Sequence, residues 1–485
     1  MKAIVDDPLG EQQKVFHYLI RQGKRTLFGR HHSFNAITDY ESFKQRVPLR
    51  TYEDFLPYIQ RIQKGEKDIL WKGVPKFFGK SSGTTSNTKF IPVTKASLVN
   101  QVHAPKYAAL NYAHRYNTTS FLKGKMLLFS DGHFFENIGG IKSAPISTIA
   151  YSCIPKLYSS VCLPSTRTNA IRDYERRIEA MVKETVGKDI RTVVAMPVWL
   201  LVYLRALPKI TGKHFKDHFP NFQLLLLSGM DYAPYLPEIR EYIRPPFDVL
   251  ETYPSTEGFI AYGDRVEERG MQMVLNKGIF YEFVPVTELY KDNPKRICLT
   301  DVQVGINYAL VLNTNAGLWG YVNGDTVRFK TVFPHRFEIT GRIAQYISAF
   351  GEHVTLEEAD KSISEAVNET GTTLVDYTVA PNIKKDGSIP YHEWFVEFGK
   401  PPADIAAFEK LLDKKICNRN FSYKDLVVNK AIEPLKINIV RPNGFIDFLR
   451  HTGKTGLQQK VPHLSNDYKL ANRLKEILHL PSNDC

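Results

Sequence analysis

From Phe77 onward, short apolar runs alternate with amphipathic helical patterns, and this alternation constrains the fold more than any other feature. The runs Lys125 to Ser130, Thr192 to Met196 and Leu224 to Leu227 are too short for buried helices and are bounded by Gly, Pro or Ser. Between two of them, Ile171 to Val182 places its apolar residues on one helical face. Strands that alternate with such helices predict an α/β fold, in which a mostly parallel sheet is covered on both faces.

The segments on either side of this region have a different pattern. The first 75 residues predict helices, for example Gln12 to Gln22 and Tyr52 to Lys64. Between Gly278 and Phe333, turn residues separate short strand candidates, which favours an antiparallel sheet or a small barrel. These candidates are Phe280 to Pro285, Arg296 to Val302, Leu310 to Asn313 and Thr326 to Phe329.

The residues after Arg342 predict a small α+β domain of their own. A hairpin is indicated by Thr373 to Ala380 and His392 to Phe398, with Lys385 to Gly387 as the turn, and Ile405 to Ile416 predicts a helix. We therefore expect a large domain over residues 1–340, a hinge at 341–344 and a small mobile domain over 345–485.

Composition and charge exclude several classes of protein. Of the 485 residues 43% are hydrophobic, and the excess of 13 basic over acidic residues lies wholly in the part up to Arg342. No stretch of five consecutive basic residues occurs, so we expect no nucleic-acid partner.

Cysteine spacing and hydropathy set the expected compartment. The five cysteines form no C-x-x-C pair, which supports neither a disulfide framework nor a zinc site. Asp6 and Asp7 stand where a signal peptide would need its apolar core, and the longest apolar run, Val193 to Leu204, is about half of a membrane span. We expect a cytoplasmic, monomeric protein without a membrane partner.

The most informative stretch runs from Ser81 to Lys89, S-S-G-T-T-S-N-T-K. Small hydroxyl residues around a glycine can fold so that N–H groups and hydroxyls converge on phosphate oxygens, and a lysine adds positive charge. The stretch is not a Walker A sequence. Taken alone, it is more typical of a plain loop.

Three further segments accompany it in order. Tyr253 to Glu257 places an aromatic ring, a hydroxyl and a carboxylate just after an apolar run, and Glu257 offers the hard oxygen that magnesium prefers. Tyr321 to Asp325 is a turn that would present Asp325 to a ribose diol, and Arg342 follows at the expected domain boundary. Each segment also has a purely structural interpretation: core, hairpin turn and linker.

Taken together and in this order, the segments resemble the adenylate-forming superfamily of acyl-CoA synthetases, adenylation domains and luciferases. The closer resemblance is to a bacterial-type member of the Gretchen Hagen family, the auxin-responsive acyl acid amido synthetases. It covers nearly the whole chain and includes segments that acyl-CoA synthetases in general do not share. These are Leu227 to Met230 with Tyr232 nearby, Tyr281 to Val286, Asp301 to Gly305, and Gln459 to Pro462.

The resemblance implies a role for each segment. Tyr253 resembles the adenine-stacking ring, Thr256 the residue near the α-phosphate, Glu257 the magnesium ligand, Asp325 the ribose ligand and Lys460 the lysine of the mobile domain. The nucleotide-binding residues implied are Ser81, Ser82, Gly83, Thr84, Thr85, Lys89, Gly229, Met230, Tyr253, Asp325 and Arg342, and the catalytic ones are Lys460, Thr256 and Glu257.

The chain departs from the family pattern at several positions. Val322 stands where an arginine is usual, Asn87 where a glycine is common, and His463 where an arginine is common. Asn tolerates positive φ better than most residues, so the loop can keep its conformation. Lys454 competes with Lys460 for the role of the mobile lysine.

The resemblance implies a ligase that uses ATP and Mg²⁺. It would convert a small carboxylic acid to an acyl adenylate with release of pyrophosphate, and then join the acyl group to the amine of an amino acid. A ligase with a thiol acceptor such as coenzyme A, and a nucleotide-binding homologue without turnover, stay open as alternatives. For the acyl pocket the resemblance points to Tyr112, Phe134, Trp199 and Tyr232, aromatic residues that are equally typical of a core.

Overall fold

The computed structural model describes residues 6–81, 88–130, 132–155, 160–233, 235–289, 291, 293–343, 346–347, 349–350, 352, 354–383, 389–453, 460–465 and 468–480. By their internal contacts the residues group into two compact units. Unit 1 comprises Met1–Ala195, Phe219–Gly229 and Pro246–Thr340, and unit 2 comprises Met196–His218, Met230–Pro245 and Gly341–Cys485. Unit 2 thus also takes in residues 196–218 and 230–245, which the sequence analysis assigned to the large domain.

Unit 1 begins with the helices that the sequence predicts. They are α2 (Pro8–Gly23), α3 (Leu27–His31), α4 (Tyr40–Arg46) and α5 (Leu56–Gln63), with single 3₁₀ turns at η1 (Phe34–Ala36) and η2 (Glu53–Phe55). Their apolar faces form an aromatic core in which Phe28, Phe34 and Phe55 pack with Trp319 and Tyr321. The N-terminal helices therefore pack against the region around residue 320.

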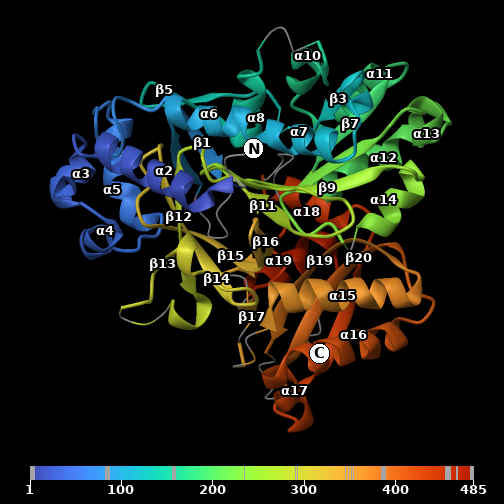
Figure 1. The fold of residues 1–485 in the computed structure, drawn as a ribbon. Coiled ribbons are helices and arrows are strands. Elements are labelled where there is room, and N and C mark those ends of the chain that lie inside the picture. Colours follow the sequence, from blue (N-terminus) through green and yellow to red (C-terminus); the bar gives the residue numbers. More distant parts are fainter. Residues whose placement is uncertain are drawn as a thin grey trace. The chain divides into compact units, whose positions relative to one another are not determined.

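A sheet of 12 strands runs through unit 1, and five neighbouring strands in it are parallel (Figure 1). They are β3 (Lys125–Leu128), β6 (Cys162–Leu163), β7 (Ile190–Ala195), β8 (Leu224–Ser228) and β9 (Asp248–Pro254), in the order β9-β8-β7-β3-β6. The strands predicted at Lys125, Thr192 and Leu224 are confirmed.

The remaining strands of this sheet are antiparallel. They are β10 (Phe259–Gly263), β11 (Met271–Met273), β12 (Ile279–Pro285), β13 (Ile297–Cys298), β14 (Asn307–Thr314), β15 (Tyr321–Val332) and β16 (His335–Arg342), in the order β13-β12-β14-β15-β16-β11-β10. The predicted antiparallel arrangement of these strands is confirmed, and they continue the large sheet. The strand predicted over Arg296 to Val302 is only two residues long and passes into the 3₁₀ turn η5 (Leu299–Asp301).

A smaller sheet of four strands also belongs to unit 1. Its order is β2-β1-β5-β4, with β1 (Phe77–Ser81), β2 (Lys89–Val93), β4 (Glu136–Ile138) and β5 (Ile141–Pro145). The helices of this part are α6 (Lys95–His103), α7 (Pro105–Arg115), α8 (Ile146–Ser152), α10 (Thr166–Asn169) and α11 (Tyr174–Thr185), with η3 (Ser120–Leu122). The helix predicted over Ile171 to Val182 is α11.

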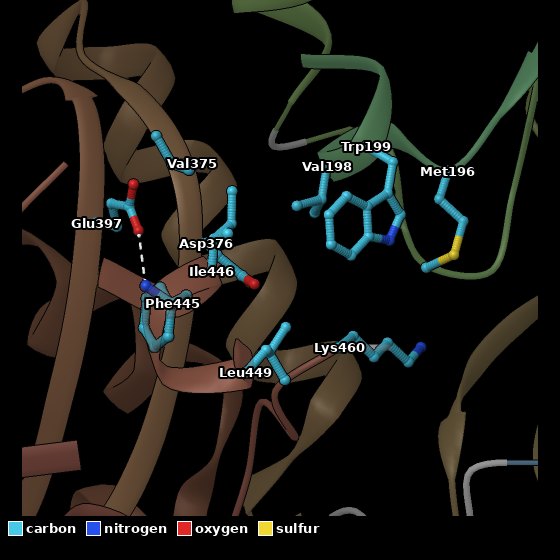
Figure 2. Close-up of a pocket in the computed structure, with 10 residues that line it drawn as sticks. All are labelled: Met196, Val198, Trp199, Val375, Asp376, Glu397, Phe445, Ile446, Leu449 and Lys460. Atoms are coloured by element: carbon cyan, nitrogen blue, oxygen red, sulfur yellow. Dashed lines mark hydrogen bonds between the residues drawn. The ribbon is translucent and has the colours of Figure 1, made fainter. Parts of the chain in front are cut away.

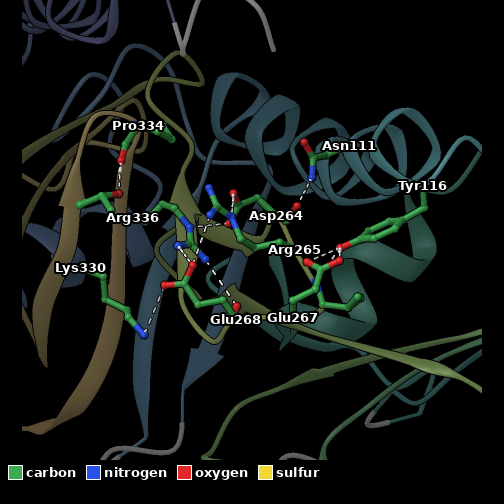
Figure 3. A network of polar contacts seen from close by, with 11 residues as sticks. Asn111, Tyr116, Asp264, Arg265, Glu267, Glu268, Lys330, Pro334 and Arg336 are labelled. Atoms are coloured by element: carbon green, nitrogen blue, oxygen red, sulfur yellow. Dashed lines mark hydrogen bonds and ion pairs between the residues drawn. The ribbon is translucent and has the colours of Figure 1, made fainter.

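Charged side chains fix the loop between β10 and β11 (Figure 3). Arg336 of β16 is fully buried, and its guanidinium binds Asp264 at 2.7 Å and Glu268 at 2.9 Å. Lys330 of β15 pairs with the same Glu268 at 3.6 Å. The network thereby anchors one end of the β9-β10 hairpin, whose other end carries the Tyr253 to Glu257 segment.

Unit 2 contains a three-stranded sheet in the order β19-β20-β21, and its helices pack on the sheet core. The strands are β19 (Thr373–Asn382), β20 (Tyr391–Lys400) and β21 (Glu433–Val440), with the short pair β17 (Tyr346–Ile347) and β18 (Val354–Thr355). The helices are α12 (Pro197–Thr211), α13 (Phe215–His218), α14 (Leu236–Ile243), α15 (Leu356–Thr370), α16 (Ile405–Arg419), α17 (Phe421–Val428), α18 (Gly444–His451) and α19 (Lys469–Leu478).

The predicted hairpin strands are β19 and β20, which pair antiparallel, and the predicted helix is α16. The predicted turn at Lys385 to Gly387 lies outside the described residues. Among the helices that the structure describes, none combines the length and apolar character that a bilayer crossing requires.

Candidate functional site

The motif residues of unit 1 gather at the carboxyl ends of its parallel strands. β8 ends at Ser228, which pairs in register with Thr252 of β9, so that Gly229 and Tyr253 lie at the same edge of the sheet. Gly229 has a φ of +85°, which favours glycine at this sharp exit. In open α/β sheets, ligands bind outside the carboxyl ends of the strands. This edge is therefore the candidate site.

The tip of the β9-β10 hairpin presents Thr256 and Glu257. The turn is closed by bonds between its first and last residues, Ser255 and Gly258, including an N–H to carbonyl bond of 2.9 Å. Helix α6 supports it from outside: the Gln101 side chain donates to the Ser255 carbonyl at 2.9 Å. Both Thr256 and Glu257 are half-buried. A turn held at several points keeps these side chains in fixed positions, which a catalytic group requires.

Thr256 packs against β1, the strand that leads into the predicted phosphate loop. A Cβ atom on Gly79 would lie 2.5 Å from the Thr256 Cγ2, so only a glycine at this position permits the contact. Two residues further on, Ser81 ends β1 and pairs in register with Lys89 at the start of β2. The structure thus brings Thr256 to the base of the loop. Ser82, Gly83, Thr84, Thr85 and Asn87 lie outside the described residues.

Tyr253 and Asp325 also meet at this site. The Tyr253 hydroxyl donates to the Asp325 carboxylate, and the Asn323 side chain donates to that hydroxyl at 3.0 Å and to the carboxylate at 3.3 Å. The Tyr253 ring also contacts Phe337 edge to face, with centroids 6.2 Å apart. The ring predicted to stack on a base and the carboxylate predicted to bind a ribose are therefore adjacent.

Glu257 has a partner that the sequence analysis missed. The Tyr321 hydroxyl hydrogen-bonds the Glu257 carboxylate, and burial together with the charge of Glu257 raises the pKa of Tyr321 well above its usual range. The backbone of Arg50 holds Tyr321 on both sides, accepting from the Val322 N–H at 2.9 Å and donating to the Gly320 carbonyl at 2.8 Å. The N-terminal helical region therefore determines where Glu257 is held.

Tyr52 is a second residue that the sequence analysis missed. It is 5% exposed, and its hydroxyl accepts the backbone N–H of Phe90 in β2 at 2.7 Å. The neighbouring Lys89 places its ammonium 5.4 Å from the centroid of the Tyr52 ring. A tyrosine in an expected helix is typical of a core, so the sequence carries no signal for these long-range contacts.

The donor set at this edge fits a magnesium ion that also binds phosphate oxygens. Among the described residues, no group of three or more His, Cys, Asp or Glu side chains could hold a metal ion. Magnesium usually keeps several waters and is bound through one or two carboxylates plus substrate phosphates. Glu257, half-buried at the tip of the turn, is a carboxylate of that kind.

The remaining nucleotide candidates belong to unit 2. Lys460 is half-buried and lines a cavity together with Trp199, Leu449, Asp376 and others (Figure 2). Met230 directly follows Gly229, and Arg342 is the last residue of β16. Lys454, which competes with Lys460 for the role of the mobile lysine, lies outside the described residues.

The four aromatic residues suggested for the acyl pocket are divided between the units. Tyr112 lies at the opposite edge of the sheet from Tyr253, since its hydroxyl donates at 2.5 Å to Asp248, the first residue of β9. Burial raises the pKa of Tyr112 above its usual range. Phe134 follows the carboxyl end of β3, with the Arg172 guanidinium 5.1 Å from its ring, whereas Trp199 and Tyr232 belong to unit 2.

Comparison with protein-family models gives three successive matches of one family. The GH3 family N-terminal domain matches residues 1–182, the GH3 family central domain residues 272–342 and the GH3 family C-terminal domain residues 357–469.

Curated relatives align over most of this chain and of their own length. A jasmonoyl–L-amino acid synthetase of Nicotiana attenuata is 23% identical, covering 91% of this chain and 88% of the relative. An indole-3-acetic acid-amido synthetase of Arabidopsis thaliana is 21% identical, and the match covers 93% of this chain and 88% of the relative.

Solved structures share the fold. The acyl acid amido synthetase GH3.15 matches 98% of this chain and 94% of its own with a TM-score of 0.81 at 18% identity. A 2-hydroxyisobutyryl-CoA ligase, in complex with an acyl adenylate, has a TM-score of 0.62 at 14% identity. The match covers 99% of this chain and 92% of the ligase chain. The chain therefore has the adenylate-forming fold, and its likeness to the amido synthetase is greater than its likeness to the ligase.

Proposed function

We propose, because this chain belongs to the GH3 family, that it activates a carboxylic acid with ATP and then joins the acyl group to the amine of an amino acid. The acid would first become an acyl adenylate with release of pyrophosphate. The curated relatives described above are named a jasmonoyl–L-amino acid synthetase and an indole-3-acetic acid-amido synthetase, and these names support this assignment.

One observation carries the proposal: Thr256 and Glu257 stand on a rigid turn that packs against Gly79 of β1, at the base of the predicted phosphate loop. Tyr253 and Asp325 stand beside the same turn, in hydrogen-bond contact with each other. An adenylating enzyme must bind base, ribose and phosphates of one nucleotide together. Residues suited to each of these groups are close together at this edge.

The first half-reaction needs positioning and charge compensation more than proton transfer. The carboxylate is already ionised, and its attack on the α-phosphorus adds negative charge to oxygens that repel one another. Glu257 would hold Mg²⁺, which when bound would neutralise part of the charge on the phosphates. Lys89 and Lys460 are the cations that we assign to the phosphates and to the developing charge, and Thr256 orients the reacting groups.

The second half-reaction needs a different arrangement, because a neutral amine must reach the adenylate. We propose that residues 341–344 act as the hinge between the large domain 1–340 and the mobile domain 345–485. In this proposal Lys460 serves adenylation only. Lys460→Ala would then abolish ATP–pyrophosphate exchange and spare amide formation from a supplied acyl adenylate, and the equal loss of both would refute the division.

The first alternative function differs from the proposed one in the molecule that accepts the acyl group. A coenzyme A thiol is the acceptor of the ligase that shares this fold at lower similarity. A protein that binds nucleotide without turnover is the other alternative, and Val322, in place of the arginine usual for the family, motivates it.

A two-step screen separates these functions. Pyrophosphate release from ATP and Mg²⁺ is measured with a panel of carboxylic acids, and hydroxylamine traps the acyl adenylate as a hydroxamate. Each acid that responds is then offered amino acids and coenzyme A, with the products identified by mass spectrometry. We expect amides. Thioesters would overturn the acceptor assignment, and ATP binding without pyrophosphate release for any acid would overturn the proposed reaction.

A further inference from the structure

His463 of unit 2 lies between two carboxylates. Its Nδ1 is 3.3 Å from an oxygen of Asp360 in α15, and its Nε2 is 3.0 Å from an oxygen of Asp376 in β19. All three side chains are almost fully buried. A neutral imidazole donates from one nitrogen only, whereas this geometry offers an acceptor to each nitrogen. A doubly protonated, positively charged ring satisfies both of these acceptors.

Other groups around the imidazole complete this cluster. The Tyr377 ring lies 4.2 Å from the imidazole, centroid to centroid, and its hydroxyl donates to Asp360 at 2.5 Å. The Tyr235 hydroxyl donates to Asp376 at 3.3 Å. The carboxylates thus accept bonds from several sides, and the ring is the cation that balances them.

The balance of effects on the His463 pKa agrees with this geometry. Burial lowers the pKa, but hydrogen bonds and charge from Asp360 and Asp376 outweigh it and raise the pKa to about 9. The pKa values of Tyr235 and Tyr377 are held well above their usual range by burial and the same carboxylates, so these hydroxyls stay protonated. Lys460, which shares a cavity with Asp376, is the other cation on this segment.

The backbone next to His463 is docked on β19, the end strand of its sheet. The Val379 N–H donates to the His463 carbonyl at 2.8 Å, and the Ser465 N–H donates to the Val379 carbonyl at 2.9 Å. The Thr378 hydroxyl donates to the Pro462 carbonyl at 2.5 Å. Lys460 lies three residues before the charged ring on this docked segment.

We propose that His463 is a positioning residue for Lys460: its imidazolium, held by Asp360 and Asp376, locks the segment of residues 460–465 in register on β19. The segment pairs with β19 at the bridge between Val379 and Leu464, so a shift of the chain at this point would move the place from which Lys460 emerges. This inference rests on the proposed function, in which Lys460 serves adenylation. An arginine at this position would provide a permanent cation for the same two carboxylates.

The first test compares the two half-reactions in His463→Gln. Glutamine leaves the two carboxylates without a cation, so the docked segment loses its register. We expect ATP–pyrophosphate exchange to fall at least roughly tenfold, which is the effect of about 1.4 kcal/mol on a rate. Amide formation from a supplied acyl adenylate should change less than roughly twofold, because Lys460 has no part in it. Equal loss in both half-reactions would overturn the inference.

The second test is a pH profile with His463→Arg. A histidine whose pKa is raised by folding supplies its stabilisation fully below its unfolded pKa of about 6.5, and loses it as the pH rises through the folded value. Wild-type exchange should therefore decline as the pH passes about 9. His463→Arg should retain exchange to higher pH, because arginine stays charged. If exchange activity declined over the same alkaline pH range in both proteins, the inference would be overturned.

A matched variant separates positioning from general stability. His392 pairs with Glu352 at 2.8 Å in the same unit, and both side chains are fully buried. His392→Gln should lower the thermal midpoint, as His463→Gln does, without changing the ratio of the half-reactions. A ratio of half-reactions that changed equally in His392→Gln and His463→Gln would overturn the inference, whereas an inactive wild-type protein would instead count against the proposed function.

Discussion

Removal of the Tyr52 hydroxyl should weaken ATP binding, although Tyr52 lies in the N-terminal helical region. In Tyr52→Phe the ring remains beside the Lys89 ammonium, and only the acceptor of the Phe90 N–H is lost. A buried donor without its partner costs about 1–3 kcal/mol, and we take about 1–2 kcal/mol because Phe90 is half-buried. Since 1.4 kcal/mol is a factor of ten, the dissociation constant for ATP should rise roughly 5- to 30-fold.

The assay is equilibrium ATP binding measured by calorimetry, together with urea unfolding. Tyr308→Phe is the matched control, because its buried hydroxyl accepts the Gln303 N–H at 3.0 Å elsewhere in unit 1. Both variants should lose similar unfolding free energy, and only Tyr52→Phe should lose affinity for ATP. If the two variants kept wild-type affinity after similar losses of stability, Tyr52 would be a core residue without influence on the phosphate loop.

Three further predictions test the site and the fold. Glu257→Gln should raise the Mg²⁺ concentration needed for pyrophosphate release at least roughly tenfold, whereas Glu41→Gln, a change on an exposed helix, should not. Burial raises the pKa of Glu397 to about 7. Wild-type stability should therefore fall as the pH rises from about 4.3 to 7, and Glu397→Gln should flatten that part of a plot of thermal midpoint against pH. Arg336→Met should cost about 3–5 kcal/mol in urea unfolding, because it leaves the buried Asp264 with only its longer contact to Arg265, and Asp264→Asn in the same chain should restore part of the loss.

The fold was largely predictable because its signals are local. The runs at Lys125, Thr192 and Leu224 are short, apolar and bounded by turn residues, and they are observed as β3, β7 and β8. The limits of such reasoning appear at Arg296 to Val302, where an apolar pattern predicts a strand. There only Ile297–Cys298 pairs with a neighbour, because the chain turns into η5 directly afterwards.

The candidate site was predictable only where a motif holds several of its residues together. Tyr253, Thr256 and Glu257 are close in sequence and remain close in the structure. The Tyr52 hydroxyl accepts the backbone N–H of Phe90, which is 38 residues away in the sequence. The Tyr321 hydroxyl bonds the carboxylate of Glu257, which is about 60 residues away. No local sequence pattern links either tyrosine to its partner. Tyr112 shows the converse: its aromatic ring suited an acyl pocket, yet its hydroxyl binds Asp248 at the far edge of the sheet.

The two lysines assigned to the phosphates depend on the same kind of support. Lys89 directly precedes Phe90, whose N–H is held by Tyr52, and Lys460 lies three residues before His463, which two aspartates hold. A lysine side chain is long and flexible, so its position depends on where its backbone leaves a fixed strand. A slip of one residue would reverse the face of β2 at Lys89, and a shift of the segment bridged to β19 at Leu464 would move the place from which Lys460 emerges. We therefore expect Tyr52 and His463 to position the two lysines for phosphate chemistry without contacting the nucleotide themselves.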